Sequence, residues 1–561
     1  GNLGGGGGKV AVHEDDGISD ANPFLHNASH AVIFWCSTVS AECPMGKFNV
    51  APDDHASMVA GIAGSTHPLA TGIAPELPQL LSANFQTFST SGGFYAKSVE
   101  AMEWAIANGA AVINISWGDA CAGEDFWTRY ADHVVRNLGR TLVVSAGNSS
   151  WCQVGWPANA WNVITVGAIS DNGNAFLEGD TMAGFSSFID PAFSGAMKPE
   201  VVAPGVSVQS TDTTCCDWLS GGFGSGTSFA APQVTGQVAL AIARQPGQSG
   251  WPETNKAVVL ASAYQNVAAG TQQDGVGQPI VTNSDSAYRN GQFRNDCGAG
   301  CVPLQAVDFP RSYVVPLTAG KRVRVGLAYD SVPTCTGSRL STGCASDVRG
   351  ADIDLRILKP DGTYLTGSFS IANTWELVEF TVPVSGNYTF RAELTGADAG
   401  WPGTFVGVAW ALRNRPTYCT DVSPVSPVVG TTKAFQVDTL RYPTFYDMYP
   451  GYGALLNGRE RVFKVVVPAG TTRNIKVTDT NASMDLVIFR TSTNACDETA
   501  DTPTVLAAGF NLAQVKDAPE GTYYVAVDGY NGYVGTTAVT FSFPSALSGL
   551  DRDVTAAEAG R

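Results

Sequence analysis

Over about its first 265 residues the sequence alternates short apolar runs with amphipathic stretches, and this alternation constrains the fold more than any other feature. Runs such as AVINIS and TLVVSA are almost continuously apolar, as strands are when both faces of a parallel sheet are covered. Amphipathic stretches of helical length lie between them at 96–108 and 125–138. The pattern predicts an α/β fold with a parallel sheet flanked by helices, whose strands include 9–12, 31–35, 111–116, 141–145 and 162–168.

The rest of the chain has a different character. After a helical pattern at 255–264, the composition shifts to Gly, Gln, Asn and Ser, and from 311 onward short strands alternate with Gly, Pro and Asp turns. This is typical of β-sandwich or jelly-roll domains, and residues 460–543 repeat the order of strands seen before them. We therefore expect an α/β domain at 1–270, an extension at 271–310, a β-sandwich at 311–415, a second β-sandwich at 416–546 and a tail at 547–561.

Charge and hydropathy narrow the range of partners. The chain has 33 basic and 50 acidic residues, a formal net charge of -17, which disfavours nucleic acids, anionic membranes and acidic substrates. No apolar run approaches the roughly 18 residues of a membrane span. The sequence starts at Gly1 rather than Met, so we expect a mature form from which an export signal has been removed. We also expect a monomer, because no apolar interface pattern repeats.

The cysteines predict disulfides and secretion. The chain has 12, an even number, and their neighbours lack the C-x-x-C and histidine spacing of a zinc site. Disulfides in an oxidising compartment are the better interpretation. Three pairs are close in sequence and two more pairings are open: Cys36 with Cys43, Cys297 with Cys301, Cys335 with Cys344, Cys121 with Cys152, and Cys419 with Cys496. The partners of the adjacent Cys215 and Cys216 stay open.

One serine stands in a segment suited to nucleophilic chemistry. In SGTSFAAPQVTG at 225–236, glycine and small residues lead into Ser228 at the start of a helical pattern. Pro232 fits this helix if it lies in the first turn, where backbone N–H groups have no intrahelical partner. A serine hydroxyl needs an adjacent base, and a helix N-terminus stabilises a developing oxyanion. Taken alone, Ser228 also fits an ordinary helix N-cap.

Two further segments supply the missing groups. DDHASMVAGIAGS at 53–65 places His55 at the start of a helix with small residues. VVSAGNSS at 143–150 ends a buried strand with Asn148, whose side-chain amide can donate to an oxyanion. Ser228, His55 and Asn148 together predict acyl-transfer chemistry.

In this order, HASMVAG, SAGN and GTSFAAP resemble the histidine, oxyanion asparagine and serine motifs of the subtilisin family. VINISWG, PANAWNVITVGA and KPEVVAPGV also resemble segments of that family, and the likeness spans about residues 9–265. The resemblance implies a serine endopeptidase acting on polypeptides, in which His55 takes the proton of Ser228, an acyl-enzyme forms, and Asn148 holds the oxyanion.

The resemblance also implies the substrate-binding residues. Ser116, Trp117 and Gly118 would pair with the extended substrate backbone, and Gly147 would lie near the pocket for a substrate side chain. Trp117 stands where the family often has leucine. It either narrows a neighbouring subsite or packs in the core.

The acidic member of the triad is ambiguous. The family has an aspartate in a pattern like V-A-V-x-D-S-G-I, whereas this chain reads VAVHEDDGI, with one residue more before Gly-Ile. Counting back from Gly17 selects Asp15, and counting forward from the strand selects Glu14. We expect Asp15, with Glu14 as the main alternative and Asp16 as a third.

The remaining expectations concern metals and competing functions. The chemistry needs no cofactor; structural calcium is common in such proteases, with Asp352, Asp354 and Asp485 as weak ligand candidates. The β domains resemble pre-peptidase C-terminal or jelly-roll modules. A catalytically weak binding or adhesin protein with the same fold is the main alternative. An esterase would need G-x-S-x-G, and the residues around Ser228 are GTSFA.

Overall fold

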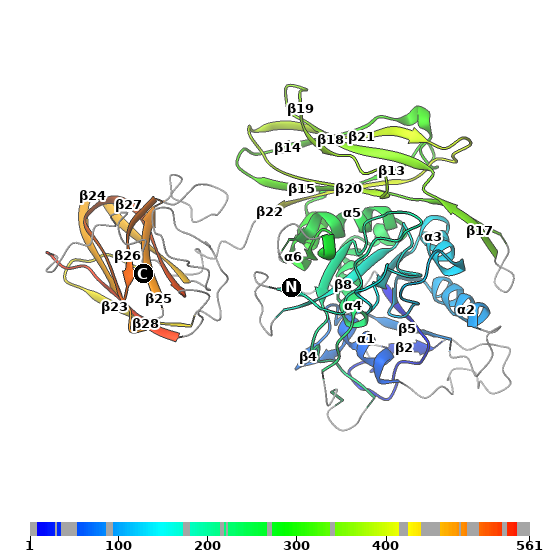
Figure 1. Ribbon diagram of the computed structural model, residues 1–561, viewed down its shortest axis with the longest axis horizontal. Helices are drawn as coiled ribbons and strands as arrows, with labels where there is room; N and C mark the ends of the chain where they lie inside the picture. Colours follow the sequence, from blue (N-terminus) through cyan, green and yellow to red (C-terminus); the bar gives the residue numbers. More distant parts are fainter. Residues whose placement is uncertain are drawn as a thin grey trace. The chain divides into compact units, whose positions relative to one another are not determined.

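The computed structural model (Figure 1) forms two compact units, one of residues 1–170 and 181–413 and the other of residues 171–180 and 414–561. It describes residues 8–27, 31–34, 53–85, 94–171, 180–213, 218–219, 223–265, 267, 272–336, 343–413, 425–438, 461–481, 484–490, 504–529 and 536–546.

The first unit is built on an eight-stranded sheet in the order β10-β8-β7-β6-β1-β5-β2, with β9 paired to β8. The pairings along this path are parallel, and only β9 is antiparallel. The strands are β1 (Lys9–Glu14), β2 (Ala31–Phe34), β5 (Gln79–Asn84), β6 (Ala110–Ile115), β7 (Thr141–Ser145), β8 (Ile164–Ser170), β9 (Thr181–Met182) and β10 (Val201–Pro204). The predicted parallel sheet is confirmed.

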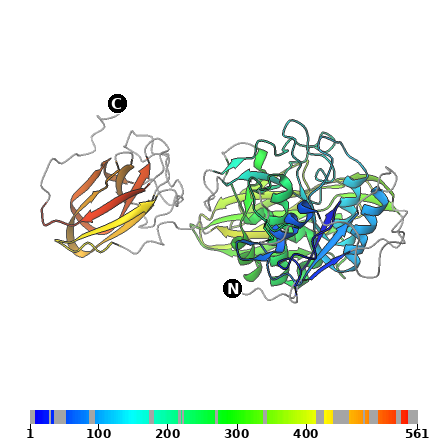
Figure 2. The same ribbon diagram turned by 90° about the horizontal axis from the view of Figure 1, so that it is seen from below.

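Alternation along β1 shows how helices cover both faces of this sheet. Val10 and Val12 pack in one apolar cluster with Val59 of helix α1 (Asp54–Gly64), while Ala11 belongs to another cluster with residues of α2 (Phe94–Ala107) and α3 (Phe126–Leu138). Helix α4 (Thr227–Arg244) lies on the α1 side, where Ala239 joins the first cluster. Figure 2 shows the same layers turned by 90°. The sequence therefore predicted the layers correctly.

The segment predicted as an extension has regular structure. It contains α6 (Val281–Arg289), which packs beside α4, and β13 (Phe293–Asp296), which joins a sheet of the following β domain. Short two-residue strands also occur in this unit: β3 (Thr66–His67), β4 (Ala70–Thr71), β11 (Ala263–Tyr264) and β12 (Gln278–Pro279). The domain boundaries themselves stay predictions.

Two facing antiparallel sheets make up the first β domain, in the orders β13-β22-β15-β20 and β14-β21-β18-β19. Their inner faces meet in an apolar core that includes Val325, Ile353 and Phe390. The strands are β14 (Arg311–Leu317), β15 (Arg322–Tyr329), β18 (Ala351–Leu358), β19 (Tyr364–Ser368), β20 (Trp375–Thr381), β21 (Gly386–Ala397) and β22 (Val406–Arg413), with a hairpin of β16 (Val332–Thr336) and β17 (Gly343–Val348). The predicted β-sandwich is confirmed.

Helix α5 (Pro252–Ser262) packs directly against this sandwich, as Figure 1 shows. Two glycines of the sheet allow the close approach: a Cβ on Gly407 would lie 2.3 Å from the backbone N of Thr254, and one on Gly326 would lie 2.7 Å from the carbonyl O of Ala257. One apolar cluster continues from α4 and α5 to Ala328 and Ala409 of the sandwich. The α/β domain and the first β domain therefore share a core.

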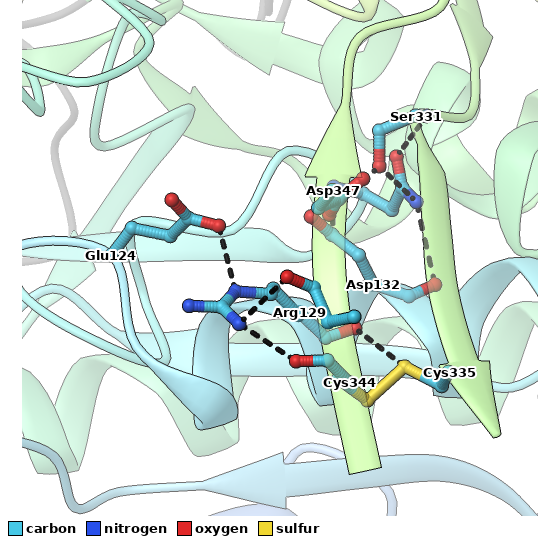
Figure 3. The surroundings of a disulfide bond; sticks show 9 residues. Glu124, Arg129, Asp132, Ser331, Cys335, Cys344 and Asp347 are labelled. Carbon is cyan, nitrogen blue, oxygen red and sulfur yellow. Dashed lines mark hydrogen bonds and ion pairs between the residues drawn. A yellow bond between two sulfur atoms is a disulfide. The ribbon is translucent and has the colours of Figure 1, made fainter.

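The β16–β17 hairpin reaches helix α3, as seen in Figure 3. Arg129 of α3 donates to the carbonyl O of Cys344 (2.7 Å) and pairs with Glu124 (2.8 Å). The disulfide between Cys335 and Cys344 closes the hairpin at this contact. The predicted Cys297–Cys301 disulfide is also present, and so is Cys121–Cys152, a pairing that the sequence left open. The other predicted cysteine positions, Cys36, Cys43, Cys215, Cys216, Cys419 and Cys496, lie outside the described residues.

A pair of buried carboxyl groups lies beside this contact (Figure 3). Asp132 of α3 accepts hydrogen bonds from the backbone N–H groups of Trp161 (3.0 Å) and Asn162 (2.6 Å), and Asp347 of β17 forms a side-chain hydrogen bond with it. The hydroxyl of Ser331 donates to Asp347 (3.3 Å). Burial, and then the charge of Asp132, raise the pKa of Asp347 well above its usual range. Burial also raises the pKa of Asp132, and the hydrogen bond between the two carboxyl groups requires a proton on one of them.

The second unit contains a six-stranded antiparallel sheet in the order β23-β28-β24-β27-β25-β26. The strands are β23 (Thr432–Asp438), β24 (Arg461–Thr478), β25 (Met484–Arg490), β26 (Thr504–Phe510), β27 (Leu512–Gly529) and β28 (Thr536–Ser542). Phe463, Val525 and Phe541 are in its core. A second all-β region is thus present. No described helix of either unit is long and apolar enough to cross a membrane.

The Asp132–Asp347 pair predicts how stability depends on pH. A carboxyl with a raised pKa in the folded state contributes stability that is complete below about pH 4 and is lost as the pH rises through the raised value. A tenfold difference in proton affinity between the folded and unfolded states corresponds to about 1.4 kcal/mol of this stability. We expect the melting temperature of Asp347→Asn, which keeps a donor towards Asp132, to fall less between pH 5 and pH 8 than that of the unmodified protein. Calorimetry at pH 5 and pH 8 measures these melting temperatures.

Asp398→Asn, at an exposed carboxyl of the same domain, is the matched control and should retain the original pH dependence. Identical pH dependence in Asp347→Asn and the unmodified chain would contradict the assignment.

Candidate active site

Ser228 is the second residue of α4 and is largely buried, with 9% of its surface exposed. Pro232 lies inside this helix and not in its first turn, so the reason given for it from the sequence was wrong. Because Pro232 has no N–H, the carbonyl of Ser228 lacks its usual partner four residues on. The hydroxyl of Ser116 donates to that carbonyl instead (2.9 Å).

A buried polar network holds Ser116 at the end of β6. The side-chain amide of Asn114 donates to the Ser116 hydroxyl (2.8 Å), and the hydroxyl of Thr235 on α4 donates to Asn114 (2.9 Å). In return, the Ser228 hydroxyl donates to the carbonyl O of Ser116 (3.1 Å). Ser228 and Ser116 are therefore joined twice, and this places the hydroxyl of Ser228 at the carboxyl end of the sheet.

Asn148 contacts the first residue of the same helix. Its Oδ1 accepts from the backbone N–H (2.9 Å) and the hydroxyl (3.0 Å) of Thr227. Its Nδ2 has no hydrogen-bond partner among the described residues and lies 3.4 Å from where a Cβ on Gly226 would be. Gly147 precedes it with a φ of +101°, in the left-handed region, and donates its N–H to Thr227 (3.1 Å). The amide is thus oriented with its donor free beside the start of α4.

His55 is the second residue of α1, where the side chain of Asp53 caps the helix by accepting from the His55 N–H (2.7 Å). Its ring lies edge-on to Phe229, the residue after Ser228, with ring centroids 5.6 Å apart. The described hydrogen bonds direct the Ser228 hydroxyl to Ser116 and not to His55. The structure therefore brings His55 beside the start of α4, with the serine hydroxyl turned away.

The acid beside His55 is Glu14, not Asp15. Glu14 Oε2 lies 3.5 Å from Nδ1 of His55, and the Glu14 side chain is almost completely buried. β1 runs to Glu14, so period-two alternation puts Glu14 on the face of Val10 and Val12, which is the face covered by α1. Asp15 follows the strand. The extra residue is thus accommodated after β1, and the preference for Asp15 does not match this geometry.

The charges around His55 change its proton affinity. Burial lowers the pKa of His55, but the hydrogen bond and charge of Glu14, with the charges of Asp53 and Asp16, outweigh this effect and raise it. Burial and then the charge of Asp53 raise the pKa of Asp15. The site therefore favours an imidazolium at His55.

A cavity of about 260 Å³ opens beside Ser228. The predicted substrate-binding residues Ser116, Trp117, Gly118 and Gly147 all line it, together with Asn148 and Ser228. The lining also includes Asp119, Ala120, Ser149, Gly155, Trp156 and Ala158, which the sequence did not single out, and Ser145, Ala146 and Thr227. Cys121 and Cys152, which flank these segments, were the sequence signal that could have pointed to them.

The two walls of the cavity are joined covalently and by backbone contacts. The Cys121–Cys152 disulfide connects the segment after β6 with the segment after β7. The N–H of Asp119 donates to the carbonyl O of Trp156 (3.0 Å), and a Cβ on Gly155 would lie 1.7 Å from the Asp119 carbonyl O. Only glycine fits at 155, and the spacing of the walls is fixed.

The predicted calcium ligands are not gathered into a cluster. Asp352 and Asp354 lie two residues apart on β18, and Asp352 pairs with Arg349 (2.7 Å). Asp485 lies on β25, in the other unit. Within the described ranges no three His, Cys, Asp or Glu side chains are placed to hold a metal ion. Structural calcium stays a prediction.

The sequence of this chain is similar to those of several known proteins. Residues 5–300 match the subtilase family. Subtilisin DY of Bacillus licheniformis is 33% identical over 237 residues, covering 41% of this chain and 77% of that protein. Subtilisin E of Bacillus subtilis (strain 168) is 33% identical over 246 residues, covering 42% of this chain and 56% of that protein.

Among solved structures, the self-cleaved protease domain of PatA covers 52% of this chain and 99% of its own, at 23% identity and a TM-score of 0.40. The prenylagaramide maturation protease PagA covers 51% and 94%, at 25% identity and a TM-score of 0.39. The family match spans more than half of the sequence and contains Ser228, His55 and Asn148. The chain therefore belongs to the subtilase family of serine peptidases.

Proposed function

We propose that the protein is a secreted serine endopeptidase in which Ser228 is the nucleophile, His55 its general base and Glu14 the acid that orients His55. The observation that carries this proposal is the buried Glu14 carboxylate 3.5 Å from Nδ1 of His55, whose ring lies edge-on to Phe229, the residue after Ser228. This supports catalysis over the alternative of a weakly active binding or adhesin protein.

In the proposed reaction, the Ser228 side chain rotates away from the Ser116 carbonyl and its hydroxyl proton passes to Nε2 of His55. The serine Oγ attacks the scissile carbonyl, and the imidazolium returns the proton to the leaving amine as the C–N bond breaks. Water then hydrolyses the acyl-enzyme with His55 again as base. The raised pKa of His55 is consistent with an imidazolium stabilised by Glu14.

The oxyanion would be held by Nδ2 of Asn148 and the backbone N–H of Ser228. Thr227 occupies the Asn148 Oδ1 and so supports an orientation with the donor towards the reacting carbonyl. Loss of one such donor usually costs about 100- to 1000-fold in turnover. Asn148 is thus the proposed oxyanion residue.

Polypeptides are the proposed substrates. Residues 116–118 would pair with the substrate backbone as an added strand, and a substrate side chain would enter the cavity beside Gly147. No cofactor takes part in the chemistry. The disulfides support an extracellular location, and we expect a monomer.

The nucleophile is tested by labelling with a fluorophosphonate probe. The unmodified protein should be labelled and should hydrolyse casein, because Ser228 lies beside a base and an oxyanion donor. Both properties should disappear in Ser228→Ala. Ser225→Ala, in the loop before α4, is the matched control and should keep labelling. Absence of labelling in a folded, processed protein would favour the binding-protein alternative.

The choice between the two acids is tested by Glu14→Gln and Asp15→Asn. We expect Glu14→Gln to lower kcat by about 100- to 10,000-fold, since an amide cannot hold the imidazolium. It should also move the acid limb of the pH–rate profile to lower pH, because Glu14 raises the pKa of His55. Asp15→Asn should change kcat less than tenfold. A larger loss in Asp15→Asn would restore Asp15 as the triad acid.

The Cys121–Cys152 disulfide predicts an effect on substrate binding. Replacing both cysteines with alanine should raise KM several-fold with a smaller change in kcat, because the two walls of the cavity lose their covalent connection. It should also lower stability by about 3 kcal/mol. The control is Cys335→Ala with Cys344→Ala, which removes the hairpin disulfide at α3 and should change stability without changing KM. Equal KM values in the two double variants would contradict this role.

A further inference from the structure

His13 is a completely buried histidine that the proposed mechanism does not use. It precedes Glu14 on β1, faces the opposite side of the sheet, and has 0% of its surface exposed. Its ring contacts Phe85, Trp117 and Trp127, with centroids 4.7, 5.5 and 5.9 Å away. An imidazole in such apolar surroundings is costly unless both ring nitrogens have partners.

Both nitrogens of His13 have partners, and these partners fix its tautomer. Nε2 lies 2.8 Å from the carbonyl O of Ser98 on α2, which only accepts, so Nε2 carries the proton. Burial lowers the pKa of His13 to about 4, while the Ser98 hydrogen bond has the opposite effect, and the ring is neutral near pH 7. Nδ1 is therefore an acceptor, and it takes the indole N–H of Trp117 at 3.1 Å.

Trp117 links this buried group to the cavity. It follows Ser116, lines the cavity, and makes edge-on contacts with Phe85 (5.0 Å), Trp127 (5.1 Å) and Trp156 (6.1 Å). Trp156 lines the cavity too. A half-buried indole N–H needs an acceptor, and the surrounding rings offer none. His13 supplies it, so the two residues form a matched pair.

We propose that His13 is a positioning residue for substrate binding, which fixes the Trp117 indole and so sets the shape of the cavity wall. The proposal rests on the proposed function only in taking the cavity as the site of a substrate side chain. Its effect is on the binding of substrates with a large apolar side chain in the cavity, because these contact the wall that Trp117 helps to form.

The test compares KM and kcat for peptide substrates with Phe or Ala at the position that enters the cavity. His13→Leu removes the acceptor, and we expect it to raise KM for the Phe substrate about 2- to 10-fold, the usual effect of one hydrogen bond. kcat and fluorophosphonate labelling of Ser228 should change less than twofold. His13→Asn places an amide oxygen near the position of Nδ1 and should recover most of the loss.

Two further variants complete the experiment. Trp117→Phe keeps a ring but lacks the N–H, so it should raise the same KM, and the double variant His13→Leu/Trp117→Phe should add little to either change. Trp117→Phe alone also tests the proposal if His13→Leu does not fold. His133→Leu, at a partly buried histidine of α3, is the matched control and should leave KM unchanged.

A readout independent of activity is the indole N–H resonance of Trp117, identified by its loss in Trp117→Phe. It should shift in His13→Leu and stay near its original position in His13→Asn. Unchanged KM in both His13→Leu and Trp117→Phe, or equal changes in His13→Leu and His13→Asn, would overturn the proposal. If the unmodified protein is not labelled at Ser228, the proposed function itself fails, which is a distinct result.

Discussion

The two hydrogen bonds between Ser116 and Ser228 connect the end of β6 to the start of α4, and the geometry of the site depends on them. Proline at position 232 makes one of them available by leaving a helical carbonyl without its intrahelical donor. Pro232, a residue type that normally interrupts a helix, therefore allows the Ser228 carbonyl to connect α4 to the end of β6. The same contact holds Ser228, the segment 116–118 and the cavity wall together.

Sequence motifs were sufficient to propose those parts of the site whose signal is local. Ser228, His55, Asn148 and the segment 116–118 each stand in a short motif, and the structure brings them to one end of the sheet. The acid was ambiguous because motif spacing alone does not say where β1 ends. Once the strand is known to reach Glu14, side-chain alternation places Glu14 on the face covered by α1, which favours it as the proposed acid. Asp119 and Trp156 had only the flanking paired cysteines as a signal, and the role of His13 could not be found, since it comes from contacts far apart in sequence.

The fold was predictable to a similar degree. Apolar runs identified the parallel sheet and the two β regions, but the polar composition of 271–310 concealed α6 and β13, which are stabilised by neighbours and not by a pattern of their own. Close packing of α5 against Gly326 and Gly407 was also invisible, because a glycine in a strand does not reveal what approaches it. The first β domain is consequently part of the same core as the peptidase domain.

The last two residues of β1 serve opposite faces of the sheet, and this restricts how the strand can vary. A shift of its pairing by one residue would exchange them, bringing an imidazole opposite His55 and a carboxylate among Phe85, Trp117 and Trp127. The first change removes the anion beside the imidazole, and the second buries a charge without a partner. An insertion or deletion within β1 would therefore disturb both faces, whereas the turn after Glu14 accommodates the additional residue that this chain carries.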